Sequence, residues 1–196
     1  MRLVVDWDGT VTVRDSLVQV IHEFGDPSLL AELEPRVGVD LTLHEEIALE
    51  FQSIRATLDE VVVWVLEHVE VREGLHELAA LEPLVISAGF HELIQPVLER
   101  EGVRLEVLAN TVEAGPNGWR VAFRDEAACA TCGEPCKRGA LAASPYVYVG
   151  DGYSDRCAAL AAERVFARDA LARHLDALGV AYEPFDDLHD VARALS

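Results

Sequence analysis

Short apolar segments recur along the chain, and most of them end at Gly, Pro, Ser or Asp. Runs such as Leu3-Val4-Val5 are apolar at every position, which is typical of parallel strands buried on both faces of a sheet. The pattern predicts strands at residues 3–5, 84–86, 105–108, 146–149 and 165–167.

Between most of these segments, apolar residues recur at the spacing of a helix with one buried face. The predicted helices lie at residues 74–81, 91–100, 138–143, 155–162 and 170–178. Strands that alternate with helices in this way form a doubly wound, mostly parallel α/β sheet. We therefore expect the α/β fold class.

One long segment interrupts the alternation. Residues 13–71 contain no clear strand, but their apolar residues recur at helical spacing, and Thr57 followed by Glu60 predicts a capped helix start. The segment is too long for a simple crossover. We expect a core made of residues 1–12 and 72–196, with residues 13–71 as a small helical insert.

A second interruption lies between residues 111 and 123. Here the motif "GPNG" joins two segments in which apolar and polar residues alternate. An Asn-Gly pair between such segments is a strong hairpin signal. The sequence therefore predicts a β-hairpin at this place.

The composition limits the partners. A formal net charge of −19 repels the phosphate backbone, so a nucleic acid partner is not expected. The same charge repels a free anionic substrate, which must be received at a local cationic site. No segment suits a membrane span, and the first apolar run stops at Asp6, too soon for a signal peptide. We expect a cytoplasmic protein with no membrane partner.

Polar residues gather where the predicted strands end. Asp6 and Asp8 follow the first strand, residues 87–89 (Ser-Ala-Gly) follow the second, and residues 150–155 ("GDGYSD") follow the fourth. Lys137 stands near the start of the predicted helix before the fourth strand. Because ligands bind at the carboxyl ends of strands in open α/β sheets, these residues form a candidate site.

The acidic residues suit a divalent cation and phosphoryl transfer. Asp6 and Asp151 offer oxygen ligands to Mg²⁺, and Asp155 adds a ligand or orients a water. One carboxylate of the Asp6–Asp8 pair is then free to attack phosphorus, which forms an aspartyl-phosphate. The other protonates the leaving oxygen and then activates water. We expect Mg²⁺ as the cofactor.

The remaining polar groups suit the phosphate itself. Ser87 and the backbone N–H groups of Ala88 and Gly89 are expected to hydrogen-bond its oxygens, and Lys137 adds a point charge. Thr10, in the turn after the first strand, is a further expected phosphate-binding residue. Ser87 and Lys137 therefore belong with Asp6 and Asp8 among the catalytic candidates.

Each of these motifs is ordinary when taken alone. Asp-x-Asp-Gly is often only a polar turn, small residues are common at strand ends, and a lone lysine is usually solvated. A calcium loop is excluded, because it needs Gly at its sixth position and Glu at its twelfth, where this chain has Val11 and Leu17. Only the joint occurrence of the motifs favours an active site.

Together, "DWDGT", Ser87 in "ISAGF", Lys137 and "GDGYSD" resemble the four motifs of the haloacid dehalogenase superfamily of phosphohydrolases. The resemblance covers nearly the whole chain. It implies a Rossmann-like core, and the helical insert resembles the small cap of the phosphoserine-phosphatase-like branch. It also implies Asp6 as nucleophile and Asp8 as general acid and base. Mg²⁺ would be bound by Asp6, Asp151 and the backbone carbonyl of Asp8.

A narrower resemblance concerns the substrate. "VREGLHEL", "VISAGF" with the following Pro96, and "CGEPCK" are similar to the methionine-salvage phosphatases that act on 2-hydroxy-3-keto-5-methylthiopentenyl 1-phosphate. Phosphoserine phosphatases share an acid after the first motif, here Asp15, but bind the substrate carboxylate with a cap arginine. This chain places Glu50 in that region, with Arg55 as the nearest basic residue. A glutamate repels a carboxylate, so phosphoserine is the less favoured substrate.

Four cysteines form a further candidate site. Cys129, Cys132 and Cys136 have the spacing C-x2-C-x3-C, and Cys157 lies two residues after Asp155. Four thiolates are a ligand set for structural zinc. A disulfide framework is not expected in a cytoplasmic protein. An oxidised pair and free buried thiols are the alternatives to zinc.

We therefore predict a Mg²⁺-dependent phosphomonoester hydrolase that acts on a small phosphorylated metabolite, as a monomer or homodimer. The cap must close over whatever is bound, which disfavours phosphoproteins and nucleic acids. Two other classes stay open. One is a regulatory protein that binds a phosphometabolite without turnover, and the other is a phosphotransferase that passes the phosphoryl group to another alcohol.

Overall fold

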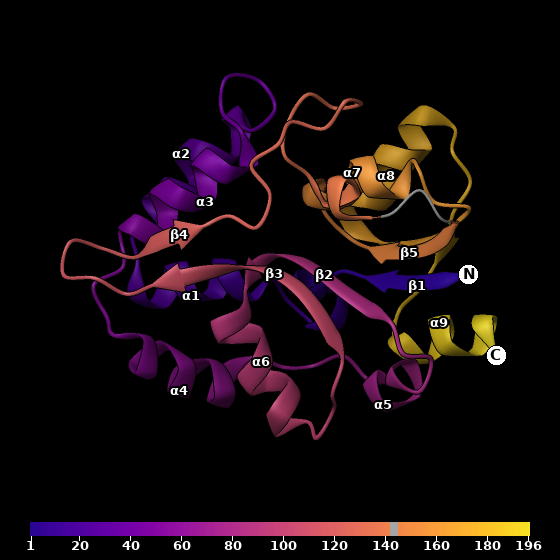
Figure 1. Ribbon diagram of the computed structural model, residues 1–196, viewed down its shortest axis with the longest axis horizontal. Helices are drawn as coiled ribbons and strands as arrows, with labels where there is room; N and C mark the ends of the chain where they lie inside the picture. Colours follow the sequence, from indigo (N-terminus) through magenta and orange to yellow (C-terminus); the bar gives the residue numbers. More distant parts are fainter. Residues whose placement is uncertain (142–144) are drawn as a thin grey trace.

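The computed structural model describes residues 1–141 and 145–196. Its centre is a seven-stranded sheet with the strand order β4-β3-β2-β1-β5-β6-β7 (Figure 1). Neighbouring strands run parallel, except that β3 and β4 are antiparallel. The strands are β1 (Arg2–Val5), β2 (Leu84–Phe90), β3 (Glu106–Glu113), β4 (Arg120–Ala122), β5 (Tyr146–Gly150), β6 (Arg164–Ala167) and β7 (Glu183–Pro184). This arrangement confirms the predicted α/β class.

Helices cover both faces of the sheet (Figure 1). On one face lie α5 (Leu75–Ala79), α6 (His91–Arg100) and α9 (Leu188–Leu195), and on the other lie α7 (Arg156–Ala159) and α8 (Asp169–Leu178). Successive side chains of β1 point to opposite faces, so Val5 packs in the cluster of Leu78 and Val191, and Val4 packs in that of Leu171. None of the helices described here has the length and apolarity to cross a membrane.

The segment between β1 and α5 is helical, as the sequence predicts. It contains α1 (Ser16–Phe24), α2 (Ser28–Leu33), a 3-10 turn at Glu34–Arg36, α3 (Leu43–Gln52) and α4 (Leu58–His68). The predicted capping box begins α4. The Glu60 N–H donates to the Thr57 hydroxyl at 3.3 Å, and the Glu60 carboxylate accepts the Thr57 N–H at 2.8 Å.

The two connections between this helical segment and the core lie side by side. Thr12 and Val71 form an antiparallel bridge, and the Val13 N–H donates to the Glu70 carbonyl at 2.9 Å. The segment therefore leaves and re-enters the core at one place.

The predicted hairpin is present and packs on the helical segment. Figure 1 shows β4 beside α3. The indole N–H of Trp119 donates to the Ala56 carbonyl at 2.8 Å, and its ring packs near Phe51. Gly118 has a φ of +110°, and a Cβ there would overlap the carbonyl oxygen of Gln52. The hairpin thus joins the sheet to the helical segment through a contact that requires glycine.

The strands β2 and β3 are longer than predicted. The pairing between them is regular up to Ile86 and resumes at Phe90, with a shift of register between these two positions. Residues 87–89 therefore lie within an irregular part of β2 and not after its end. Such an irregularity re-aims side chains at the edge of a sheet, here beside the candidate site.

Other differences concern helices and the C-terminus. The predicted helix at 138–143 is a 3-10 turn at Lys137–Ala140, and its residues 142 and 143 lie outside the described part of the chain. The helix predicted at 155–162 is divided into the turn Tyr153–Asp155 and α7. The elements β7 and α9 were not predicted, because β7 has only two residues and the apolar pattern of α9 covers two turns.

We expect Gly118→Ala to lower the free energy of unfolding more than Gly102→Ala. Both glycines have positive φ values, +110° and +69°, so each alanine costs about 1 kcal/mol of backbone strain. Only at position 118 does the new Cβ meet a neighbouring backbone atom. Urea unfolding of both variants measures the difference, and equal losses would contradict the docked position of the hairpin.

Candidate active site

The turn after β1 brings two carboxylates to the carboxyl edge of the sheet. Asp6 begins the turn, and its Oδ1 accepts the N–H of Trp7 at 2.7 Å. Gly9 has a φ of +79°, and a Cβ there would overlap the Asp151 carboxylate. The Thr10 hydroxyl donates to Asp151 Oδ1 at 2.7 Å. Glycine is therefore needed for this turn to close against the end of β5.

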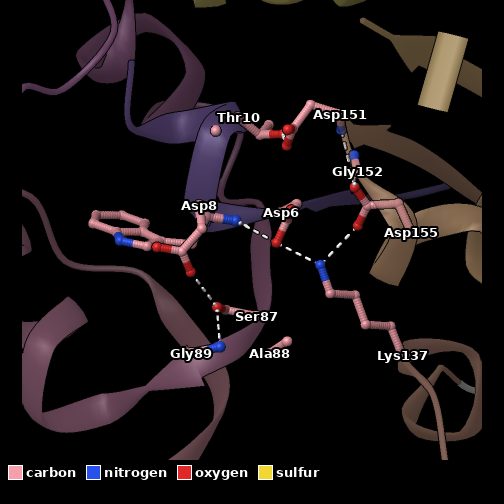
Figure 2. Close-up of polar contacts among 12 residues, drawn as sticks. Asp6, Asp8, Thr10, Ser87, Ala88, Gly89, Lys137, Asp151, Gly152 and Asp155 are labelled. Carbon is pink, nitrogen blue, oxygen red and sulfur yellow. Dashed lines mark hydrogen bonds and ion pairs between the residues drawn. The ribbon is translucent and has the colours of Figure 1, made fainter. Parts of the chain in front are cut away.

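Lys137 lies between two aspartates in a buried ion network (Figure 2). Its Nζ lies 2.5 Å from Asp6 Oδ1 and 2.7 Å from Asp155 Oδ1, and the lysine side chain is only 4 % exposed. Burial opposes the charge of the ammonium group, but the Asp155 and Asp6 carboxylates raise the pKa of Lys137. Lys137 is therefore a charged group that points at the predicted nucleophile.

Asp155 holds this lysine and is itself fully buried. Its Oδ1 also accepts the Tyr148 hydroxyl at 2.7 Å, and its Oδ2 accepts the N–H groups of Asp151 and Gly152, both at 2.9 Å. Although burial opposes ionisation, Lys137 lowers the pKa of Asp155. Four donors already surround its two oxygens. This arrangement suits a positioning residue better than the metal ligand that the sequence predicts.

Asp8 has a different set of partners. Ser16, in the first turn of α1, donates to Asp8 Oδ1, and Ser87 donates to Asp8 Oδ2 at 3.1 Å. The Ser87 hydroxyl oxygen accepts the Gly89 N–H at 2.7 Å. Burial raises the pKa of Asp8, and the two serines oppose the shift. Asp8 thus retains a proton more readily than an exposed aspartate, which suits a general acid.

The site carries more negative than positive charge. Carboxylate oxygens of Asp6, Asp151 and Asp155 lie within 4.8 Å of one another. Burial and the Asp155 charge raise the pKa of Asp6 despite Lys137, and the same two causes raise the pKa of Asp151 to about 7. A hard cation between Asp6 and Asp151 would relieve this repulsion. The donor set therefore fits Mg²⁺.

A buried arginine that the sequence reasoning missed supports the turn. Arg72 Nε donates to the Thr10 carbonyl at 2.9 Å, and its Nη2 donates to the Gly9 carbonyl at 3.0 Å. Its Nη1 donates to the Asp186 carbonyl at 3.1 Å. One guanidinium group thus connects the turn after β1 with the C-terminal part of the chain. No spacing pattern could reveal it, because its partners are backbone atoms.

A second missed residue is Asn110, in β3. Its side-chain amide donates to the Ala88 carbonyl at 2.7 Å, and its oxygen accepts the Arg124 N–H at 3.0 Å. Asn110 therefore fixes the peptide next to Ser87 and the segment that follows the hairpin. In the sequence, the only sign of this role is a polar residue in a segment that is mostly apolar around it.

A cavity of about 370 Å³ opens beside Ser87 and Lys137. His44 lines it from the helical segment, while Arg124 and Arg156 line it from the core. The Nε atoms of these two arginines are buried and have no hydrogen-bond partner in the described part of the chain. The size of the cavity suits a small metabolite, and the two arginines give part of its lining a positive charge.

Two glutamates lie on the buried side of α3. Glu50 is 6 % exposed and Glu46 is 8 % exposed. Burial, together with the charges of Glu46 and Asp15, raises the pKa of Glu50 to about 8, and burial raises that of Glu46 to about 7. Among the described residues, no side-chain hydrogen bond holds either carboxyl group. Burial and the neighbouring acids therefore favour the protonated, uncharged form of Glu50.

The structure thus brings together the polar residues that the sequence singled out at three strand ends and at Lys137. These residues are Asp6, Asp8, Thr10, Ser87, Ala88, Gly89, Lys137, Asp151 and Asp155 (Figure 2). The side chain of Asp8 is not part of the cluster of metal-ligand candidates. The four cysteines form a separate cluster.

Comparison with known protein families identifies the chain. A family model of haloacid dehalogenase-like hydrolases matches residues 3–160. The chain belongs to this family. The match includes every residue of the candidate site named above and confirms the family that the four motifs indicated.

Curated relatives of similar length carry a more specific name. A protein from Bacillus thuringiensis (strain Al Hakam) named 2-hydroxy-3-keto-5-methylthiopentenyl-1-phosphate phosphatase is 26 % identical over 219 residues, which cover 100 % of this chain and 95 % of the relative. A protein of the same name from Bacillus mycoides (strain KBAB4) is 25 % identical over 210 residues, with the same coverage.

Solved structures show the same fold. A phosphoserine phosphatase with an analogue of its phospho-aspartyl intermediate has a TM-score of 0.73 at 14 % identity, and covers 98 % of this chain and 97 % of its own. A substrate-bound phosphoserine phosphatase has a TM-score of 0.72 at 15 % identity, with the same coverage. The comparisons confirm the predicted fold and the predicted enzyme class, a phosphatase of the haloacid dehalogenase-like family.

We expect Arg72→Lys to destabilise the protein by about 2–4 kcal/mol, because a lysine leaves several buried carbonyls without donors. The same change should lower activity, since two of these carbonyls belong to the catalytic turn. Arg193→Lys, at an exposed position, is the matched control. Thermal unfolding and phosphatase assays measure both effects, and an unchanged melting temperature for Arg72→Lys would contradict the role given to it.

Proposed function

We propose that this phosphatase hydrolyses a small phosphate monoester through an aspartyl-phosphate on Asp6, with Mg²⁺ as cofactor. The observation that carries the proposal is the different surroundings of two carboxylates in one turn. Asp6 contacts the Lys137 ammonium, whereas Asp8 contacts the hydroxyl groups of Ser16 and Ser87. These surroundings support the role of nucleophile for Asp6 and that of proton donor and acceptor for Asp8.

In the first step, an Asp6 carboxylate oxygen attacks phosphorus, and the bond between phosphorus and the leaving oxygen breaks. Asp8 gives its proton to that oxygen, so the alcohol leaves as a neutral molecule. In the second step, a water molecule attacks the phosphorus of the aspartyl-phosphate and loses a proton to Asp8, and the bond between phosphorus and the Asp6 oxygen breaks. Inorganic phosphate is released, and both aspartates return to their starting states.

Asp6, Asp151 and the backbone carbonyl of Asp8 would hold the Mg²⁺ ion. Bound there, it would supply positive charge to the carboxylates and to the phosphate oxygens. Asp155 then contributes by positioning Lys137 and the N–H groups of the turn after β5. We assign Asp155 this positioning role in place of a direct metal bond.

Ser87 and Lys137 are the proposed side-chain partners of the phosphate, with the N–H groups of Ala88 and Gly89. In the present structure the Gly89 N–H donates to Ser87, so phosphate binding at Gly89 requires this bond to be exchanged or shared. The Thr10 hydroxyl is used by Asp151, and any contribution of Thr10 to phosphate binding would come from its backbone.

Residues 13–71 are proposed to act as the cap and residues 1–12 and 72–196 as the catalytic core. The paired connections at Thr12 and Val71 offer a single place about which the cap can move. Such a motion would admit substrate and then control the access of water to the aspartyl-phosphate.

For the substrate, we propose the keto-pentenyl phosphate of methionine salvage. The names of the full-length relatives support it. Glu50 supports it as well, since this buried carboxyl group, near Glu46 and Asp15, offers no positive charge to a substrate carboxylate. We also propose a cytoplasmic location and a monomeric or homodimeric state for the enzyme.

We expect Asp6→Asn to lower Mg²⁺-dependent hydrolysis of an aryl phosphate by at least about 10³-fold, because it removes the nucleophile. Asp59→Asn, an exposed aspartate in α4, is the matched control and should keep wild-type activity. Trapping and mass spectrometry of the phosphorylated wild-type chain should locate the phosphoryl group on Asp6. Substantial activity in Asp6→Asn, or an ester that survives a single-turnover assay with Mg²⁺, would refute the mechanism.

A substrate panel tests the choice of metabolite. Phosphorylated sugars, amino acids and keto compounds are compared by kcat/KM, with added acceptor alcohols to detect phosphoryl transfer. We expect the keto-pentenyl phosphate to have the highest value. A much higher value for phosphoserine would reject the salvage assignment and leave the phosphatase mechanism intact.

The raised pKa of Glu50 predicts a pH-dependent stability. The unfolded state ionises Glu50 near its ordinary pKa of about 4.5, while the folded state does so near 8, so the native protein loses stability as pH rises between these values. Glu50→Gln removes this loss. Relative to wild type, we expect its stability to increase from pH 5 to pH 8 by up to about 3 kcal/mol. A stability difference that does not change with pH would show that Glu50 is ionised in the fold.

A further inference from the structure

The four cysteines of the chain meet in one place and form a group distinct from that of Asp6, Asp151 and Asp155. The sulfur atoms of Cys129, Cys132, Cys136 and Cys157 all lie within 4.8 Å of one another. The Cys129 and Cys157 sulfur atoms are 3.9 Å apart, and all four cysteines are free thiols. Edges of about this length are expected for a tetrahedron of sulfur atoms at about 2.3 Å from a central ion.

The local backbone is a turn built around one sulfur atom. The N–H of Thr131 donates to Cys129 Sγ at 3.4 Å, and the N–H of Gly133 donates to the Cys129 carbonyl at 2.8 Å. Gly133 has a φ of +81°, which closes the turn after the second cysteine. The Cys129 N–H donates to the Glu134 carbonyl at 2.9 Å. These contacts form a compact loop that presents two thiols from the same side.

We propose that Cys129, Cys132, Cys136 and Cys157 bind a structural Zn²⁺ ion. The four-sulfur set is closed, with no place left for a substrate, as in structural and not catalytic zinc sites. Soft thiolate ligands in tetrahedral arrangement favour zinc over magnesium or calcium. The site is separate from the proposed phosphatase chemistry, whose cation is held by carboxylates.

The position of the cluster shows what the ion would stabilise. Cys136 directly precedes Lys137, and Cys157 lies in α7, two residues after Asp155. The ion would therefore join the loop that carries the lysine to the helix that follows its carboxylate partner. Lys137 Nζ and Asp155 Oδ1 lie 2.7 Å apart. The ion would stabilise this contact by joining the two chain segments that carry the residues.

Metal analysis of the purified wild-type protein, free of any affinity tag and grown with zinc, is the first test. We expect about one zinc per chain after dialysis. In the double variant Cys129→Ser/Cys132→Ser, the zinc content per chain should fall at least about ten-fold, because half of the ligands are gone. Thr131→Ala, in the same turn, keeps the backbone donor and should keep the ion. Cobalt substitution should give the absorption of a tetrahedral thiolate complex.

Metal analysis of the Asp6→Asn variant distinguishes the zinc site from the phosphatase chemistry. This variant should lose its activity and keep its zinc. If the double cysteine variant does not fold, the zinc content and the thiol titration of the wild-type protein still show whether the cysteines bind zinc. Four reactive thiols without zinc, a disulfide detected by mass, or stoichiometric iron would each overturn the zinc assignment. Loss of zinc without faster hydrogen exchange at residues 125–141 would overturn the stabilising role.

Discussion

The ammonium group of Lys137, held between Asp6 and Asp155, is the interaction on which the site depends. Without it, two carboxylates from different strand ends would be buried beside each other with no counter-charge. Removing one partner of such a buried pair typically costs about 3–5 kcal/mol. The pair also has a geometric effect, because Asp155 binds the N–H groups at the end of β5 while Asp6 begins the turn after β1. A single cation thus sets the spacing of two turns.

Much of this arrangement could be predicted, because strand ends in a parallel sheet share one edge. That rule alone brings Asp6, Ser87 and Asp151 together without any knowledge of their contacts. The rule does not extend to residues whose partners are backbone carbonyls. Arg72 binds carbonyls of the turn after β1, and Asn110 binds a carbonyl in the irregular part of β2. Every residue has a backbone carbonyl, so the sequence does not mark which ones are bound. The end of β2 was also misplaced, because its irregular part is visible only in the pairing with β3.

The charge of Glu50 in the structure differs from the charge that its sequence suggests. The sequence indicates a negative charge that would repel a carboxylate, yet burial raises the pKa of Glu50 to about 8 and favours its uncharged form. In the proposed enzyme, Glu50 would then disfavour an anionic tail through the cost of ionising a buried acid, and not through direct repulsion. The whole-chain charge of −19 acts in the same direction outside the site, so the cationic groups near Lys137 must attract the phosphate locally.

The loop that leads to Lys137 raises a separate physical problem. From Phe123 to Cys136 the chain has neither strand nor α-helix, so the backbone hydrogen bonds that fix the other catalytic segments are largely replaced by turns. If only such turns held the loop, the lysine could sample more positions, and the entropy lost on placing it would weaken the ion pair with Asp6. A covalent or metal cross-link close to the lysine reduces that loss. The cysteine cluster includes Cys136, the residue before Lys137, and Cys157, two residues after Asp155. A link at this place would therefore restrain both partners of the ion pair.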